Sequence, residues 1–267
     1  SFFAENLTAL VKTGNLDDDF DIIAEADWVV EAIIERLDIK QNLMSSIDEI
    51  RPSRCIVSTN TSGIPVASIA EGRSKGFKQH FLGTHFFNPP RYLKLLEIIP
   101  TPDSLNEVVE FMGYFGEYRL GKGIVPCKDT PNFIGNRLLS GTNAFALDYI
   151  LENGLSVPEV DAITGPVIGR PKTATFRLLD LVGIDVLGHV TQNLIPAIPH
   201  DTHALNYLKS ENVNHMLNTM MENGWLGNNT KCGFYKLVMV DGRKQFWPLD
   251  LGKLEHVEPA KPRFDSV

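Results

Sequence analysis

The chain has 267 residues, of which 43% are hydrophobic and 22% are charged. These proportions are ordinary for a globular protein, and they exclude a disordered chain, a collagen and a coiled coil. The net charge is −8 and no basic face is visible, which argues against a nucleic-acid partner. No apolar run approaches the roughly 20 residues of a membrane span, and the length suits two domains.

The three cysteines, Cys55, Cys127 and Cys232, are few and widely spaced. They predict neither a disulfide framework nor a zinc ribbon, and they favour a reducing compartment, which we take to be the cytoplasm. The spacing of His200 and His203 is a weak metal signal without a third ligand type nearby. We therefore interpret this pair as the start of a surface helix and expect no metal site.

The first half of the chain alternates between helical and strand patterns. About 26 residues at the N-terminus have helical spacing of apolar residues. Strands are then predicted at 28–34, 55–59, 81–87, 92–99 and 124–125, and helices at 37–50, 66–70 and 103–118. Such alternation indicates crossover units and a mostly parallel sheet, with ligands expected at the carboxyl ends of the strands.

After Pro131 the pattern becomes helical, with candidates at 133–152, 157–163, 176–194 and 207–222. Residues 233–249 alternate around Asp241-Gly242, which is the strongest short hairpin signal. The tail 258–267 reads as a linker. We predict an α/β fold with a domain at 1–128, an all-α domain at 129–236, and a hairpin strand and tail at 237–267.

The first long helix of the second half, 133–152, is apolar over more than one stripe. Helices that are apolar most of the way round are buried, and the other helices of so small a domain are too few to cover it. We therefore expect self-association through this half of the chain.

His85 and Glu97 are polar residues within two apolar strands. A histidine in such a strand is most often a satisfied core residue, so His85 alone favours a structural role. A lone buried carboxylate, however, is costly unless it is paired. If the strands are adjacent, Glu97 could fix the tautomer of His85 and leave its other nitrogen as a general base.

Other polar residues are ambiguous by themselves. Ser62 lies in the turn after a strand, and Asn136 lies at the start of a helix, where both residue types are common for local reasons. Gly121-Lys122-Gly123 lacks the third glycine of a dinucleotide loop, and it follows a helix instead of a strand. The residues themselves thus leave the function open.

Several collinear motifs together carry a resemblance that no single residue does. The stretches are VVEAIIERLDIK, STNTSGIP, GTHFFNPP with LKLLEII, KDTPNFIGNRLL, RLLDLVGID and NNTKCGFYKL. In this order and spacing they resemble the NAD-dependent 3-hydroxyacyl-CoA dehydrogenases of fatty-acid β-oxidation, from about residue 27 to the hairpin. The resemblance implies a partial Rossmann-like domain followed by a helical domain.

The resemblance also implies roles for individual residues. His85 matches the catalytic base and Glu97 its partner acid, while Ser62 and Asn136 match residues of the substrate site. The positions that match NAD contacts are Ile33, Ile34, Glu35, Lys40, Ser62 and Asn88. His85 would take the proton of the 3-hydroxyl as hydride leaves for NAD, and dimeric relatives imply a homodimer.

The chain departs from the family at its start, where relatives have a strand, a GxGxxG turn and a second strand. We therefore expect a truncated dehydrogenase, inactive alone, whose parent belongs among the longer or multifunctional β-oxidation enzymes. Two alternatives remain. One is a related short 3-hydroxy-acid dehydrogenase, which the THFFNP motif disfavours. The other is a non-catalytic scaffold, which the retained His85 and Glu97 disfavour.

Overall fold

The computed structural model describes residues 5–262 and residue 264. The chain divides into two compact units, Ser1–Ile134 and Gly135–Val267. The sequence pattern placed the boundary after residue 128, whereas the structure keeps the segment up to Ile134 with the first unit. Residues 237–267, which the pattern set apart, belong to the second unit.

The first unit is built on a five-stranded sheet with the order β1-β2-β3-β4-β5. Its strands are β1 (Trp28–Glu31), β2 (Ile56–Thr59), β3 (Phe81–Phe86), β4 (Leu95–Pro100) and β5 (Gly123–Pro126). All neighbouring pairs are parallel except β3 and β4. That pair is antiparallel because the short connection between its strands has no room for a crossover. The predicted mostly parallel sheet is therefore confirmed.

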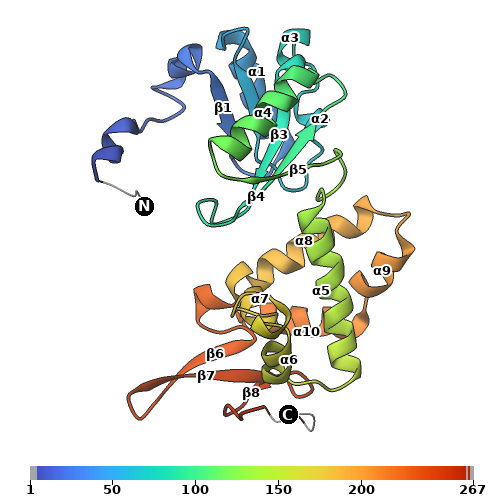
Figure 1. Cartoon of the computed structure of the whole chain (residues 1–267). Helices are drawn as coiled ribbons and strands as arrows, with labels where there is room; N and C mark the ends of the chain where they lie inside the picture. The colour runs from blue at the N-terminus through green and yellow to red at the C-terminus, as the bar shows by residue number, and fades with distance from the viewer. Residues whose placement is uncertain (1–4, 263, 265–267) are drawn as a thin grey trace. The chain divides into compact units, whose positions relative to one another are not determined.

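Helices cover both faces of this sheet (Figure 1). They are α1 (Leu37–Ile50), α2 (Val66–Ile69), α3 (Lys75–Gln79) and α4 (Asn106–Tyr118). Alternate strand residues serve different cores, since Val57 packs with Met44 of α1 whereas Ile56 packs with Met112 of α4. The pattern predicted α1, α2 and α4 but missed α3, a helix of five residues that begins at the Ser74 cap.

The N-terminal segment is not the continuous helix that its apolar spacing predicts. It forms two 3-10 helices, η1 (Glu5–Leu10) and η2 (Phe20–Glu25). Between them, Asn15 Oδ1 accepts hydrogen bonds from the backbone N–H groups of Asp17 and Asp18, and Asn15 N donates to Asp19. Because these local bonds compete with helical ones, the chain turns here instead of continuing as a helix.

The second unit contains the remaining helices of the described chain. They are α5 (Gly135–Glu152), α6 (Val157–Ile163), α7 (Phe176–Val182), α8 (Ile184–Ala197), α9 (Thr202–Leu208) and α10 (Glu211–Glu222), with short 3-10 turns η3 (Pro166–Ile168) and η4 (Asn228–Thr230). The helix predicted at 176–194 is broken at Gly183, whose φ is 105°. The one predicted at 207–222 is interrupted at Ser210, which caps α10.

A hairpin of β6 (Tyr235–Val240) and β7 (Arg243–Asp250) follows, extended by β8 (Glu255–His256). Its turn is the predicted Asp241-Gly242, and both residues have positive φ, as a two-residue hairpin turn requires. Leu249 of β7 is buried in the core of this unit. Among the described residues no single helix is long and apolar enough to cross a membrane. Helices α7 and α8 taken together have the length and composition of a span, but the chain bends by 85° between them.

Candidate functional site

His85 and Glu97 face one another across the antiparallel pair β3 and β4, where they are direct register partners. The Nδ1 atom of His85 lies 2.7 Å from Oε2 of Glu97. Both side chains are buried, with 3% of His85 and none of Glu97 exposed. The turn between the strands therefore sets a register that places the two residues opposite each other.

The second oxygen of Glu97 is held by the segment that follows β5. Ile134 N donates to Oε1 at 3.0 Å, and the thiol of Cys127 donates to the same atom at 3.5 Å. Burial, reinforced by the charge of Glu97, raises the pKa of Cys127 to about 12, so the thiol stays protonated and remains a donor. With Glu97 acting as an acceptor, the proton between the pair belongs to Nδ1 of His85.

The other ring nitrogen of His85 has an accessible polar neighbour. Ser62 Oγ lies 3.0 Å from Nε2 and donates to it in the tautomer that Glu97 selects. The imidazole also contacts the rings of Phe87 and Phe133, at centroid distances of 4.5 and 5.5 Å. A base with its tautomer fixed by a carboxylate, in apolar surroundings, suits proton abstraction from a hydroxyl.

The segment after β5 reaches Glu97 by an unusual backbone path. Asn132 and Phe133 have φ values of 60° and 48°, in the left-handed region that residues with side chains rarely adopt. Asp129 anchors the segment, because its carboxylate accepts the N–H groups of Val66 and Ala67 at the start of α2, both at 2.8 Å. Strained backbone of this kind gathers at functional sites.

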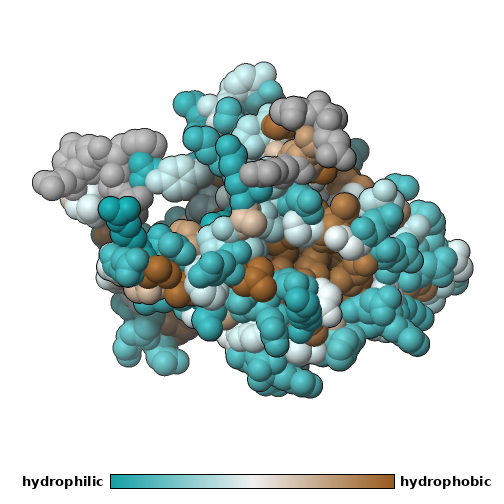
Figure 2. Space-filling view, turned by 90° about the horizontal axis from the view of Figure 1, so that it is seen from below, coloured by the Kyte–Doolittle hydropathy of each residue, from teal (hydrophilic) through white to brown (hydrophobic). Residues whose placement is uncertain are grey.

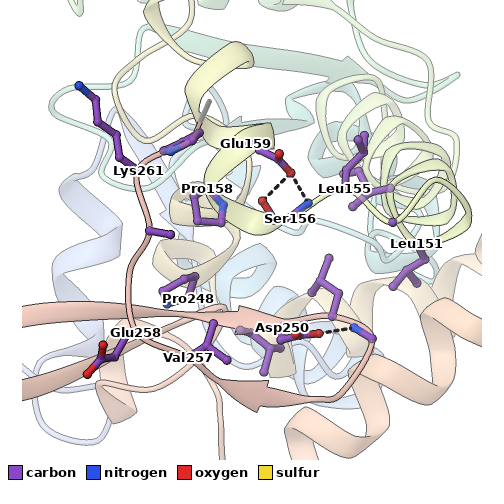
Figure 3. A pocket seen from close by; sticks show the side chains of 17 residues that line it. Leu151, Leu155, Ser156, Pro158, Glu159, Pro248, Asp250, Val257, Glu258 and Lys261 are labelled. Atoms are coloured by element: carbon purple, nitrogen blue, oxygen red, sulfur yellow. Dashed lines mark hydrogen bonds between the residues drawn. The ribbon is translucent and has the colours of Figure 1, made fainter. Parts of the chain in front are cut away.

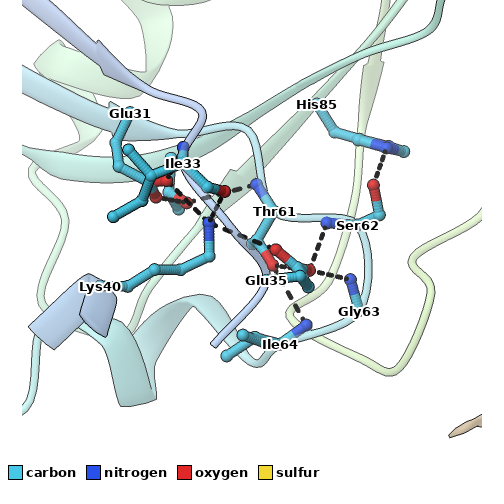
Figure 4. A network of polar contacts seen from close by, with 10 residues as sticks. Glu31, Ile33, Glu35, Lys40, Thr61, Ser62, Gly63, Ile64 and His85 are labelled. Atoms are coloured by element: carbon cyan, nitrogen blue, oxygen red, sulfur yellow. Dashed lines mark hydrogen bonds and ion pairs between the residues drawn. The ribbon is translucent and has the colours of Figure 1, made fainter. Parts of the chain in front are cut away.

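The turn that carries Ser62 is held by the carboxylate of Glu35 (Figure 4). Glu35 Oε1 accepts the hydroxyl of Thr61 at 2.5 Å and the N–H groups of Ser62 and Gly63 at 3.0 and 3.1 Å. Burial acts to raise the pKa of Glu35, but these donors and the charge of Lys40 outweigh it, and the pKa is lowered. Glu35 therefore remains a carboxylate that fixes this turn.

Behind Glu35 lies a buried ion pair between Lys40 of α1 and Glu31 of β1. Lys40 Nζ is 2.7 Å from Glu31 Oε1 and 3.2 Å from Glu35 Oε2, and it also donates to Ile33 O at 3.2 Å. Glu31 in turn accepts Ile33 N at 2.7 Å and the hydroxyl of Thr59 at 2.6 Å. The carboxyl ends of β1 and β2 are thus tied together.

The structure brings some of the sequence-predicted residues together and leaves others apart. His85, Glu97, Ser62, Glu35 and Lys40 belong to one network in the first unit. In the second unit, Asn136 lies in the first turn of α5. Asn88 follows β3, joined to Pro89 by a cis peptide bond, and the contacts predicted for these two residues stay predictions.

Sequence reasoning missed three residues that shape the site: Glu31, Cys127 and Asp129. Glu31 carries the same signal that identified Glu97, a lone acid in an otherwise apolar strand. Asp129 follows the last strand of the sheet in a polar turn, which is where functional side chains gather in such folds. Cys127 carries no signal, because a buried cysteine most often behaves as a small apolar residue.

The turns after β1 and β2 have the character of a dinucleotide-binding edge. They lie at the carboxyl ends of adjacent parallel strands, where open α/β sheets bind their ligands. Ile34 is 63% exposed there and the side chain of Glu35 is 45% exposed, so this edge offers both an apolar and a polar group. No three acidic, histidine or cysteine side chains of the described residues are grouped to hold a metal ion.

A cavity of about 810 Å³ belongs to the second unit and not to the unit that holds His85. It lies among the end of α5, the start of α6, the end of β7 and the chain after β8 (Figure 3). Hydrophobic residues gather in a hollow on the face shown in Figure 2. The carboxylates of Glu159 and Asp250 in this cavity accept hydrogen bonds from Ser156 and from Gly252 and Lys253, so they serve local structure.

Models of known families match both units of the chain. Residues 1–130 match the 3-hydroxyacyl-CoA dehydrogenase, NAD binding domain, and residues 133–237 match the 3-hydroxyacyl-CoA dehydrogenase, C-terminal domain.

Individual relatives agree with these matches. A probable 3-hydroxyacyl-CoA dehydrogenase of Bacillus subtilis is 48% identical over 86% of this chain, and one of Deinococcus radiodurans is 39% identical over 88%. The chain spans 28% and 66% of those two proteins. The crystal structure of (S)-3-hydroxybutyryl-CoA dehydrogenase from Ralstonia eutropha is 26% identical, with a TM-score of 0.70 over 80% of this chain and 72% of that one.

Proposed function

The chain belongs to the 3-hydroxyacyl-CoA dehydrogenase family, and from that premise we propose that the protein carrying it oxidises 3-hydroxyacyl-CoA to 3-oxoacyl-CoA with NAD. The observation that carries this proposal is the chain of contacts from Ser62 through His85 to Glu97. It is the arrangement of an oriented base, and alcohol oxidation needs such a base at the substrate hydroxyl.

NAD, when bound, supplies the acceptor for the hydride that leaves C3 of the substrate. Residues 33–35 after β1 and Ser62 after β2 would hold it, because they lie at the binding edge of the sheet. Asn88, in the turn after β3, is proposed as a further contact on the strength of the resemblance.

With substrate bound, the 3-hydroxyl takes the place of Ser62 as the donor to His85 Nε2, which then takes its proton, and the Ser62 hydroxyl donates to the same substrate oxygen. The buried carboxylate of Glu97 stabilises the imidazolium that forms, because the proton on Nδ1 already lies toward it at 2.7 Å. Asn136 of α5 is proposed to donate a further hydrogen bond to the substrate. The rings of Phe87 and Phe133 keep water from the base.

The reverse reaction tests this proposal in the full-length protein. Purified protein should oxidise NADH when acetoacetyl-CoA is added, and His85→Gln should abolish most of this turnover. Acetoacetate without CoA serves as the control for a short 3-hydroxy-acid dehydrogenase. Absence of turnover with acetoacetyl-CoA in a folded protein would favour the scaffold alternative.

We also propose a homodimer formed through the second unit. Leu138, Phe145 and Tyr149 of α5 are 62%, 49% and 52% exposed, and their spacing of seven and four places them on one face of the helix. An apolar stripe of this kind is typical of an interface. Light scattering at micromolar concentration should give twice the monomer mass, and Phe145→Glu should give the monomer.

The cytoplasm is our proposal for the location of the protein. All three cysteines are free thiols, and Cys55 and Cys127 are buried in the core of the first unit, as expected for a chain that folds under reducing conditions. Fractionation of the source cells with an antibody against the chain would test it, and recovery from an oxidising compartment would contradict it.

A further inference from the structure

The resemblance places Lys40 among the residues that contact NAD, but its surroundings point to a different role. Only 1% of the side chain is exposed. A lysine ammonium has three protons to donate, and three protein oxygens lie around Nζ: Glu31 Oε1 at 2.7 Å, Ile33 O at 3.2 Å and Glu35 Oε2 at 3.2 Å. Lys40 therefore donates hydrogen bonds to Glu31 and Ile33, and its charge also forms an ion pair with Glu35.

One of these partners leads directly to the base. Glu35 Oε2 forms the ion pair with Lys40. Its Oε1 accepts hydrogen bonds from the Thr61 hydroxyl and from the N–H groups of Ser62 and Gly63. Ser62 then reaches Nε2 of His85 at 3.0 Å. An unbroken path of polar contacts thus runs from Lys40 through Glu35 to His85 (Figure 4).

Glu31 fixes Lys40 from the opposite side. Its carboxylate is also buried, and it accepts Ile33 N and the Thr59 hydroxyl, so it is bound to the ends of β1 and β2 at once. A buried pair of charges is often replaceable by apolar side chains without loss of stability. Its presence here therefore calls for a role other than stability.

We propose that Lys40, held by Glu31, is a positioning residue: its charge orients the carboxylate of Glu35, which sets the 61–63 turn so that Ser62 meets His85 Nε2. This inference rests on the dehydrogenase activity proposed above. It assigns the effect of Lys40 to the reacting atoms through Ser62 and not to a direct contact of Lys40 with the cofactor.

Steady-state kinetics of the full-length protein separates the two roles of Lys40. In Lys40→Met, a misplaced Ser62 lowers kcat about 100-fold even at saturating cofactor, because the lost interaction belongs to the transition state. If Lys40 instead holds the cofactor, KM rises and kcat at saturation is unchanged, which overturns the inference. The control is Arg36→Met, which removes a cation of the exposed pair with Asp38.

A double variant separates positioning from stability. Lys40→Met alone leaves Glu31 buried without its cation and destabilises the fold, whereas Glu31→Gln/Lys40→Met removes both charges and regains most of the stability in urea unfolding. The double variant should still show the 100-fold lower kcat, because Glu35 still lacks its cation. Recovery of kcat along with stability would show that the pair is only structural and would overturn the proposal.

Nuclear magnetic resonance of ¹⁵N-labelled protein provides a readout that needs no turnover. Ser62→Ala defines the change at the His85 Nε2 signal when the serine contact is absent. Lys40→Met and Glu35→Gln should move this signal in the same direction, while Arg36→Met leaves it in place. Glu35→Gln keeps the test usable if Lys40→Met fails to fold, since the neutral amide keeps the size of the side chain but loses the ion pair with Lys40 that orients it. An unmoved Nε2 signal in both variants overturns the inference.

The outcomes for the activity and for Lys40 are distinguishable. If wild-type protein does not turn over acetoacetyl-CoA, the proposed function fails while the resonance experiment still tests the positioning path. If wild-type protein is active and Lys40→Met has wild-type kcat, only the inference about Lys40 fails.

Discussion

Glu97 binds His85 with one carboxylate oxygen and the chain after β5 with the other: Oε2 lies 2.7 Å from Nδ1, and Oε1 lies 3.0 Å from Ile134 N. The pairing register of β3 and β4 supplies the first contact, and the strained turn at Asn132 and Phe133 supplies the second. The orientation of the base therefore depends on two segments that are separate in sequence.

Substitution of either member of this pair should lower turnover in the full-length protein. We expect His85→Gln and Glu97→Gln each to lower kcat by ~10²–10⁴-fold, which is the usual contribution of a general base. The double variant should be little worse than the more damaged single variant, because the two side chains act as a unit. Losses that multiply fully in the double variant would show that they act independently.

The thiol of Cys127 should contribute a small and separable part of this orientation. Cys127→Ala removes a donor to Glu97 Oε1, and a net hydrogen bond of about 1 kcal/mol corresponds to a roughly fivefold lower kcat. Cys127→Ser keeps a donor and should stay within about twofold of wild type.

Cys55→Ala is the matched control for this prediction. Cys55 is buried in the same core, so both alanine variants leave a comparable cavity, but Cys55 donates toward Ile56 O and not toward Glu97. Equal kcat values for the two alanine variants would show that Cys127 is only a core residue.

The sequence predicts the frame of the molecule well, because its strands and helices follow apolar periodicity. It fails where a single residue overrides that periodicity. Asn15 ends a helical pattern with side-chain hydrogen bonds, and Gly183 breaks another with φ of 105°. The spacing of apolar residues indicates which face of a helix or strand is buried, but it does not indicate where the backbone turns.

The candidate site is predictable where a buried charge has to be explained. A lone acid in an apolar strand needs a partner, and this argument predicts the pairing of Glu97 with His85. The same argument applied to Glu31 predicts a partner for that acid as well, which is Lys40 in the structure. Cys127 and Ile134 could not be found in this way. One is apolar in character, and the other acts through its backbone N–H, whose direction depends on the path of the chain.

Gly233 should not accept a side chain, because it lies against a buried carboxylate. A Cβ at this position would come within 2.0 Å of Asp180 Oδ1 and 2.6 Å of Gly227 Cα. We expect Gly233→Ala to lower the free energy of unfolding by more than about 2 kcal/mol, in the range of an overpacked core. Urea unfolding followed by circular dichroism measures this change.

Gly113 of α4 provides the opposite case. A Cβ there would have nothing within 4 Å, and alanine is favoured over glycine within a helix by roughly 0.5–1 kcal/mol. Gly113→Ala should therefore stabilise the protein slightly. If both alanine variants were neutral, the close approach of Gly233 to Asp180 would be wrong.

Asp180 should make the protein less stable as the pH rises from about 4 to 7. Burial raises its pKa to about 6, although it accepts the N–H groups of Phe234 and Tyr235. Because the unfolded carboxyl ionises near 3.8, the folded state holds more protons between these values, and stability falls as the pH increases. A difference of about two units corresponds to roughly 3 kcal/mol.

The measurement is urea unfolding of wild type and Asp180→Asn at pH 4, 5, 6 and 7. The asparagine does not ionise, so its own cost is constant, and the stability of wild type relative to the variant should decrease by up to about 3 kcal/mol across this series. Asp241→Asn at the exposed hairpin turn is the control, since asparagine also tolerates the φ of 48° found there. A relative stability of wild type that instead increased with pH would mean that the two N–H donors outweigh burial at Asp180, and that its pKa is lowered in the folded protein.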